Sequence, residues 1–243
     1  MSTAFDTTQY QDCYPDGIEK NYWNLSRNRL LHELVTRGES TKVLEIGCGR
    51  GLVVDYLRSR GVEIWGCDTA TTTAITEAAA PYLRLGTDAF DLEEGRKKNT
   101  KTIMLLDMLE HLPEPEEFLG RCRAEFPNAT RFIITLPARQ EIWSNYDEYY
   151  GHFKRYSLES AAQLVNSVDL DVSESGYFFH SLYAASRVLT LLGRNRETVV
   201  RPPSGAIATK VNRAIAAFLS AESRLLPKTL PGSSLYLVAR LNR

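Results

Sequence analysis

This sequence of 243 residues has no excess of positive or negative charge. It also lacks closely spaced cysteine pairs and long apolar runs. Lysine and arginine total 29 and aspartate and glutamate total 30, which leaves a formal net charge of -1. A chain so balanced has no electrostatic attraction for DNA, RNA or an anionic membrane. We therefore expect a small or neutral substrate and no nucleic-acid partner.

The four cysteines, Cys13, Cys48, Cys67 and Cys122, form no C-x-x-C pair, and we predict a reducing environment and no metal site. No stretch reaches the roughly 18 apolar residues of a membrane span. The N-terminal segment also lacks the basic and apolar parts of a signal peptide. These absences predict a cytoplasmic protein without stable membrane insertion.

Short apolar runs alternate with helical patterns along most of the chain. Such alternation is typical of an α/β fold with an open, mostly parallel sheet and helices on both faces. The expected strands are 41–47, 62–68, 82–86, 101–107, 130–137, one within 170–183, and 233–241. The expected helices between them are 18–38, 52–61, 73–80, 113–126 and 157–168.

The pattern also divides the chain into three parts. Residues 1–17 are polar and rich in turn formers, which predicts an irregular arm. Residues 18–180 and 231–243 carry the strand and helix alternation of the main domain. Residues 181–230 are mostly helical and form an insert before the last strand, expected to act as a lid or an interface.

The first predicted strand runs into a glycine-rich turn in the stretch VLEIGCGRGLVVDYL. Glycines let the backbone approach a ligand and turn into a helix whose N-terminus faces that ligand. A dinucleotide-binding loop needs its third glycine where this chain has Leu52. The order Glu45, Gly47, Gly49, Gly51 instead resembles motif I of the class I S-adenosylmethionine-dependent methyltransferases.

Three further segments extend this resemblance. Asp68 ends the second strand, where the family carries the acid that binds the ribose hydroxyls, and Asp88 in GTDAF matches the acid that meets adenine. LLDMLEHLPEPEEF resembles the corresponding segment of the ubiquinone-type branch. IWSNYDEYYGHFKRYS resembles a segment of bacterial methyltransferases that act on polysaccharide or secondary-metabolite precursors.

The resemblance implies a Rossmann-like, seven-stranded sheet with an antiparallel last strand and S-adenosyl-L-methionine as the cofactor. Alternative roles stay open for two acids, because Asp68 could only cap the next helix and Asp88 could be a solvated loop residue. The implied cofactor-binding residues are Glu45, Gly47, Cys48, Gly49, Gly51, Asp68, Thr69, Asp88, Ala89, Asp107 and Met108.

Methyl transfer requires a base only when the acceptor must lose a proton, as a hydroxyl does. His152 is the first candidate, because it lies in the aromatic loop after the fifth strand, and His111 and Tyr150 follow. Two structural alternatives remain: His152 could be tied to Asp147 or Glu148, and His111 could cap or pack before a proline.

Aromatic residues are densest in the loop after the fifth strand, where they could hold a cyclic acceptor or simply pack the loop onto the sheet. Near the N-terminus, the resemblance implies that Tyr22, Trp23 and Arg27 close over the cofactor. Arg27 and Arg155 are candidates for binding a carboxylate or phosphate. The predicted substrate-binding residues are Tyr22, Trp23, Arg27, Trp143, Tyr146, Tyr149, Arg155 and Tyr156.

One segment of the insert, IATKVNRAIAAFLSAESRLL, has helical spacing with one largely apolar face. Covering the active-site mouth or the sheet is the first explanation, a homodimer interface the second, and contact with a lipid-linked substrate the third. The few basic residues on this helix count against the membrane. The apolar positions are Ile207, Val211, Ile215, Phe218, Leu219, Leu225 and Leu226.

Together these features predict a small-molecule methyltransferase, with O-methylation of a sugar or secondary-metabolite precursor as the leading hypothesis. N-methylation or C-methylation is the alternative within the same class. Two alternatives belong to other functional classes: a non-catalytic S-adenosylmethionine-binding protein and a nicotinamide-dependent oxidoreductase.

Overall fold

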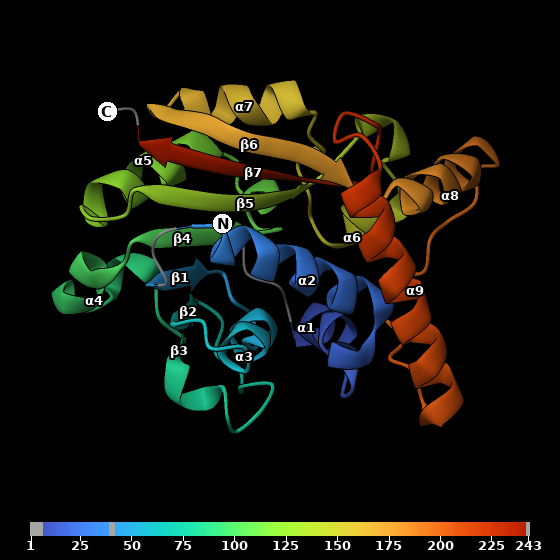
Figure 1. The fold of residues 1–243 in the computed structure, drawn as a ribbon, viewed down its shortest axis with the longest axis horizontal. Coiled ribbons are helices and arrows are strands. Elements are labelled where there is room, and N and C mark those ends of the chain that lie inside the picture. The colour runs from blue at the N-terminus through green and yellow to red at the C-terminus, as the bar shows by residue number, and fades with distance from the viewer. Residues whose placement is uncertain (1–6, 39–41, 242–243) are drawn as a thin grey trace.

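A seven-stranded sheet forms the centre of the molecule in the computed structural model, which describes residues 7–38 and 42–241 (Figure 1). The strand order is β3-β2-β1-β4-β5-β7-β6; β7 runs antiparallel to β5 and β6, and the other neighbouring strands pair in parallel. The predicted Rossmann-like fold is therefore confirmed. The strands are β1 (Val43–Ile46), β2 (Ile64–Asp68), β3 (Leu83–Leu85), β4 (Thr102–Leu106), β5 (Arg131–Pro137), β6 (Leu170–Phe178) and β7 (Ser234–Leu241).

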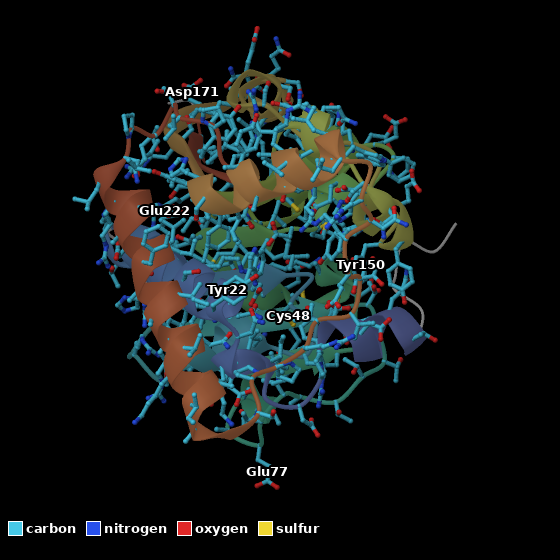
Figure 2. The ribbon with its side chains drawn as sticks, turned by 90° about the vertical axis from the view of Figure 1, so that its right-hand side faces the viewer. Tyr22, Cys48, Glu77, Tyr150, Asp171 and Glu222 are labelled. Atoms are coloured by element: carbon cyan, nitrogen blue, oxygen red, sulfur yellow. The ribbon has the colours of Figure 1, made fainter. Side chains whose placement is uncertain are left out.

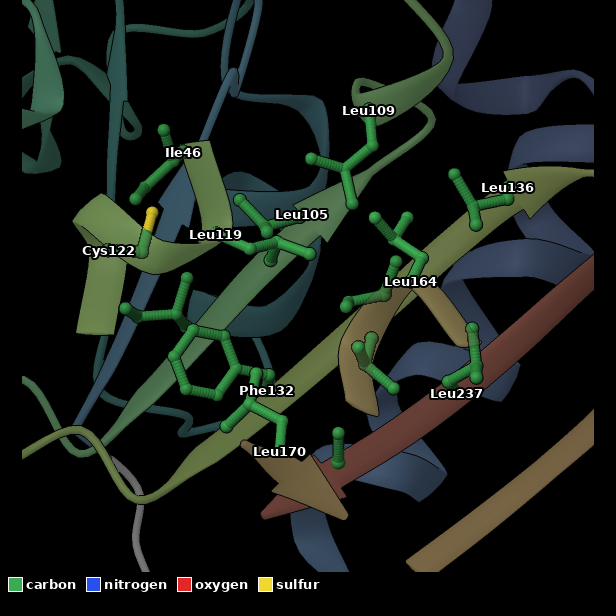
Figure 3. Close-up of a cluster of buried hydrophobic side chains, with 14 of the residues drawn as sticks. Ile46, Leu105, Leu109, Leu119, Cys122, Phe132, Leu136, Leu164, Leu170 and Leu237 are labelled. Carbon is green, nitrogen blue, oxygen red and sulfur yellow. The ribbon is translucent and has the colours of Figure 1, made fainter. Parts of the chain in front are cut away.

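Helices cover both faces of this sheet, so the central strands β4 and β5 are buried along their whole length. On one face, Leu119 and Leu164 of two helices pack against β4 and β5 (Figure 3). On the other, the apolar core includes Leu34, Val54 and Leu219 of three helices. These five helices are α5 (Pro115–Glu125), α7 (Leu158–Asn166), α2 (Tyr22–Thr36), α3 (Leu52–Arg58) and α9 (Gly205–Leu225).

Three short helices were not predicted. They are α1 (Thr7–Cys13), α4 (Glu94–Asn99) and α6 (Asn145–Tyr149). The expectation of an irregular arm over 1–17 is wrong for its described part, because α1 occupies much of it. None of these helices exceeds two turns, which is too short for an apolar period to be recognisable.

The helix predicted over 73–80 is absent from the structure, which has only a 3-10 turn at Ala80–Tyr82 there. The Thr76 hydroxyl donates to Asp55 at 2.6 Å and accepts from the Ala79 amide at 3.1 Å. Side-chain bonds of this kind give the backbone an alternative to a helix. Alanine-rich composition was therefore a misleading signal in this segment.

The insert consists of α8 (His180–Leu191), a connector over 192–204, and α9. The apolar positions of α9 do not all face the protein: Leu219 is buried, whereas Ile207 and Phe218 are exposed. The apolar positions of α9 therefore do not share one buried face. No described helix is long and apolar enough to cross a bilayer. The lid or interface role of the insert stays a prediction.

Gly51 directly precedes α3 and has a φ of 81°, in the left-handed region where a side chain is strained. A Cβ there would stand 2.5 Å from Leu83 Cδ1, so β3 packs against the turn itself. Gly61 has nearly the same φ, 80°, but a Cβ added at Gly61 would have no atom within 4 Å.

This pair of glycines gives a matched test. We expect Gly61→Ala to lower the free energy of unfolding by about 1 kcal/mol, from backbone strain alone. Gly51→Ala should cost roughly 1–3 kcal/mol more, because the added methyl also clashes with Leu83. Urea unfolding of both variants measures the difference, and equal losses would contradict the packing role of Gly51.

Candidate functional site

A cavity of about 810 Å³ lies where the carboxyl ends of β1, β2 and β4 meet. Tyr22, Cys48 and Tyr150 reach it from three different elements, and Figure 2 views the molecule from the side on which they lie. Nearly all of the predicted cofactor-binding residues line this cavity. They are Glu45, Gly47, Cys48, Gly49, Asp68, Thr69, Asp88, Ala89, Asp107 and Met108. Gly51 is not among the lining residues, so its assignment to cofactor contact is replaced by the packing role above.

Gly47 and Gly49 shape the floor of the cavity. Both have positive φ, at 77° and 55°. A Cβ on Gly47 would stand 3.0 Å from Met108 Cγ, and one on Gly49 would overlap the Tyr14 hydroxyl. The glycines therefore leave the backbone open to close neighbours, as a ligand-binding turn requires. Tyr14, which follows α1, is a lining residue that sequence reasoning missed.

Asp68 holds the glycine loop in place through both of its carboxylate oxygens. Oδ2 accepts from the Gly49 amide at 2.7 Å, and Oδ1 accepts from the Ala70 amide at 2.8 Å. The Tyr10 hydroxyl also donates to Oδ1, at 3.1 Å. Asp68 caps no helix, because the next helical turn after β2 begins only at Ala80. Its expected ribose contact stays a prediction. Tyr10 covers the carboxylate from α1, where no site residue was predicted.

Asp88 is likewise engaged while lining the cavity. One of its oxygens accepts from the Phe90 amide at 2.9 Å and caps a short 3-10 turn. This cap directs the turn so that Ala89 and Thr87 also face the cavity. The expected adenine contact of Asp88 stays a prediction.

Glu45 is a buried acid at the end of β1, only 3% exposed. Its Oε2 has no hydrogen-bond partner among the described residues. Burial raises its pKa to about 8; the negative charges of Asp68 and Asp107 add to this, and Arg27 opposes it. A carboxylate in this position favours a cationic ligand, which would offset both the burial and the neighbouring acids.

Arg27 of α2 forms an ion pair with Asp107 and lies over the Trp23 ring at 4.6 Å from its centroid. Asp107 follows β4 with a φ of 50°, a conformation that is uncommon outside glycine. The pair neutralises the guanidinium, which was expected to bind a substrate anion. In this structure Arg27 instead positions Asp107 at the cavity wall.

His152 lies at the cavity with its ring fixed by a buried carboxylate. Its Nδ1 is 2.9 Å from Asp147 Oδ1, and Arg155 Nε donates to the same oxygen at 2.7 Å. Burial alone would raise the pKa of Asp147, but the hydrogen bond from His152 and the charge of Arg155 lower it. An ionised Asp147 favours the tautomer with a proton on Nδ1, which leaves Nε2 free to accept one.

Arg155 is therefore not available to bind substrate. It is 8% exposed, and its guanidinium also donates to the Ala138 carbonyl at 3.0 Å. The sequence prediction that it binds a carboxylate or phosphate is replaced by a positioning role for Asp147. Its side chain still reaches the cavity wall.

The aromatic residues that were predicted to belong to the site divide into two groups. Tyr22, Trp23, Tyr146 and Tyr150 line the cavity, as predicted. The other three predicted rings do not line it: Tyr156 is buried in the core, and the Tyr149 hydroxyl donates to Asp12 at 2.6 Å. Trp143 contacts Glu148 instead, at 3.4 Å. Tyr149 and Tyr156 attach the loop to the rest of the protein, which was the structural alternative, whereas Trp143 bonds within the loop.

Tyr150 is poorly placed to act as a base. Its hydroxyl donates to the Thr198 carbonyl at 2.6 Å, and burial raises its pKa well above the ordinary value of 10.0. A phenol that holds its proton so strongly accepts none at neutral pH. The contact instead joins the aromatic loop to the connector of the insert, from which Arg196, Val199 and Val200 also line the cavity.

His111 and Glu110 lie directly beside His152. The two histidine rings are 4.8 Å apart between centroids, and the ligand atoms of all three residues lie within 4.8 Å of one another. Burial lowers the pKa of His111 to about 4, with a contribution from His152. Glu110 is 1% exposed, and its Oε2 has no partner among the described residues. Such a cluster could hold a divalent cation, which the prediction of no metal site did not anticipate.

Comparison with protein families identifies the chain. A model of the methyltransferase domain matches residues 20–175, which is more than half of the sequence. The chain belongs to this family. The membership confirms the resemblance found in the glycine loop, and it agrees with S-adenosylmethionine as the methyl donor of this class.

Curated relatives of the methyltransferase domain include ubiquinone biosynthesis O-methyltransferases. The protein of that name from Histophilus somni is 27% identical over 143 residues, covering 54% of this chain and 60% of the relative. The protein of the same name from Paracidovorax citrulli is 28% identical over 140 residues, covering 49% of this chain and 58% of the relative. The matches thus span about 60% of the length of these relatives.

Solved methyltransferases share the fold. The magnesium protoporphyrin IX methyltransferase of Synechocystis PCC 6803, solved with bound SAH, superposes with a TM-score of 0.52 at 12% identity, covering 97% of this chain and 93% of that chain. A plantazolicin methyltransferase, also solved with SAH, has a TM-score of 0.52 at 17% identity, covering 98% of this chain and 90% of that chain. At these identities the similarity concerns the fold alone.

The raised pKa of Glu45 predicts a pH effect on stability. The unfolded chain releases the Glu45 proton near pH 4.5, whereas the folded protein keeps it to about pH 8. Raising the pH between these values therefore favours unfolding. Glu45→Gln removes this effect, so we expect the variant to gain at least about 1 kcal/mol relative to wild type between pH 5 and pH 8.

Urea unfolding of both ligand-free proteins at the two pH values tests this prediction. Glu63→Gln is the matched control, because Glu63 is exposed and precedes β2. A constant difference between wild type and Glu45→Gln across this range would show that Glu45 ionises normally in the folded protein.

Proposed function

We propose that this protein transfers a methyl group from S-adenosylmethionine to a hydroxyl oxygen of a small molecule. One observation carries the proposal: at the cavity, buried Asp147 binds His152 Nδ1 and leaves Nε2 as a proton acceptor. Membership of the methyltransferase family supports the donor. The oxygen acceptor is supported by the names of the curated relatives, which are O-methyltransferases.

The charge around the cavity supports a cationic donor. Glu45, Asp68 and Asp107 all face it, and Arg27 is already paired with Asp107. S-adenosylmethionine carries a sulfonium and an ammonium, which these acids would stabilise. The nicotinamide-dependent oxidoreductase alternative is disfavoured by the family match, which is to the methyltransferase domain.

Methyl transfer is an in-line displacement in which the donor supplies an activated methyl group. The acceptor oxygen forms the new bond to carbon, and the carbon–sulfur bond breaks with its electron pair left on sulfur. The protein orients the two reactants in the cavity, whose wall includes the rings of Trp23 and Tyr146. The proton of the acceptor hydroxyl passes to His152 Nε2, and Asp147 stabilises the resulting charge.

The acceptor that fits this arrangement is a cyclic alcohol or phenol, of the kind found in sugars and secondary-metabolite precursors. Aromatic rings on the wall suit such molecules, because they stack on sugars and planar rings alike. N-methylation is the less favoured alternative, since an unprotonated amine does not need the base that Asp147 orients.

Replacement of the base tests the proposal. We expect His152→Ala to lower kcat by about 10²–10⁴-fold, because the hydroxyl proton then has no acceptor. Binding of S-adenosylmethionine, measured by calorimetry with NADH as the control ligand, should change little. His32→Ala, on the outer part of α2, is the matched control and should keep full activity. Full activity of His152→Ala would favour an amine acceptor or another base, and binding of NADH alone would reject the donor.

A divalent cation is a second candidate for activating the acceptor. Glu110, His111 and His152 supply the ligand atoms, and buried Glu110 has an oxygen without a partner in the described chain. A cation there would lower the pKa of a bound hydroxyl without a protein base. The two roles of His152 exclude each other, because Nε2 cannot both accept a proton and bind a metal.

Chelation separates these two roles. With His152 as the base, we expect the purified enzyme to keep its turnover after dialysis against EDTA and to gain nothing from added Mg²⁺, Mn²⁺ or Zn²⁺. Glu110→Gln should then alter kcat less than His152→Ala. Loss of activity in EDTA, restored by one of these ions in wild type but not in Glu110→Gln, would assign the cluster to a metal.

A further inference from the structure

Exposed apolar side chains are concentrated in the insert. Among the large hydrophobic residues exposed in the described chain, Phe153 alone lies outside residues 181–230. A protein surface rarely gathers so many apolar side chains without a partner. The exposed residues of the insert are Val188, Leu191, Leu192, Val199, Ile207, Val211, Ile215, Phe218, Leu225, Leu226 and Leu230.

On α9 these residues form a stripe that points away from the protein. Ile207, Val211, Phe218 and Leu225 are spaced by four or seven residues, which places them on one helical face. They are 81%, 50%, 59% and 83% exposed. Leu219 lies on the other side of the helix, in the core beneath the sheet. We call these four residues the outer stripe.

The charge of the insert is opposite to that of the rest of the protein. Residues 181–230 hold eight of the 29 basic residues and only two of the 30 acidic residues, a net charge of +6. The remainder of the chain therefore carries -7. Half of these basic residues lie on α8 and the connector, so the positive charge extends beyond α9.

Basic residues also flank the outer stripe itself. Lys210 and Arg213 are exposed on α9, and neither forms an ion pair with any residue of the described chain. Arg224 is different, because it pairs with Glu33 of α2. Lys210 and Arg213 are thus available to an external anion next to the apolar side chains.

We propose that the outer stripe and the basic residues beside it bind the surface of an anionic phospholipid bilayer. Apolar side chains enter the boundary between headgroups and acyl chains, and lysine and arginine meet the anionic headgroups. A second copy of this chain fits less well, because a two-fold interface would bring two insert surfaces of the same charge together. No helix needs to cross the bilayer for this mode of binding.

The same arrangement brings the cavity close to the bilayer. The connector between α8 and α9 contributes Arg196, Val199 and Val200 to the cavity wall. Figure 1 shows both helices of the insert together at one side of the sheet. A bilayer bound to the outer stripe therefore lies near the segment that covers the cavity. Lipid binding does not depend on the proposed reaction and is tested without it.

Vesicle flotation of the full chain tests the proposal. One set of vesicles contains phosphatidylcholine alone, and the other contains equal parts of phosphatidylcholine and phosphatidylglycerol. We expect binding to the anionic vesicles only, weakened by added salt. Phe218→Glu and Lys210→Glu should each lower the partition coefficient on the order of tenfold.

Two matched variants control for changes of charge and of exposed aromatic surface. Phe153→Glu alters a side chain of similar exposure, 61%, outside the insert, and Lys98→Glu makes the same charge change on α4. Both should bind vesicles as wild type does, and thermal melting checks that all variants fold. Absence of binding, equal binding to neutral vesicles, or equal losses in the control variants would overturn the proposal. A dimer interface would replace the lipid proposal if sedimentation showed wild type to be a dimer, Phe218→Glu to be a monomer, and neither protein to bind vesicles.

Discussion

Parallel hydrogen bonding of β1 to β2 and β4 is the constraint on which the site depends. Strands that run in the same direction end at the same edge of a sheet, so the turns that follow them meet there. Glu45, Asp68 and Asp107 are separated by many residues in the chain, yet all reach one cavity for this reason. The glycines after β1 then open the space between them, because a side chain at Gly47 would press on Met108.

This concentration of acids explains the raised pKa values in the cavity and its preference for a cationic ligand. Burial keeps a proton on Glu45, and a second buried acid, Glu110, lies beside Asp107 with its pKa well above the ordinary value. Two basic groups compensate locally, since Arg27 pairs with Asp107 and Arg155 with Asp147. The net charge is nevertheless uneven along the chain, because residues 181–230 carry +6 and the remainder carries -7.

Local signals in the sequence were sufficient for most of the fold and for the cofactor side of the cavity. Apolar runs ending in glycine or aspartate predicted the strands, and the alternation Gly47, Gly49, Gly51 predicted the turn. The same signals failed at α1, where two helical turns with few apolar residues carry Tyr10 against Asp68. They also failed among the aromatic residues, because composition does not tell a ring that lines a cavity, such as Tyr146, from one buried in the core, such as Tyr156.

The sequence by itself determined the class of fold, the family and the chemical character of the donor-binding turn, because each depends on residues close together in the chain. Tertiary structure alone decided the roles of the polar side chains. Arg27 and Arg155, both expected to bind an anion, are each paired with an acid from a distant or differently folded segment. Only three-dimensional packing also shows that α9 buries Leu219 and exposes Phe218, since both belong to one apolar pattern and the neighbouring helix covers a single side of it.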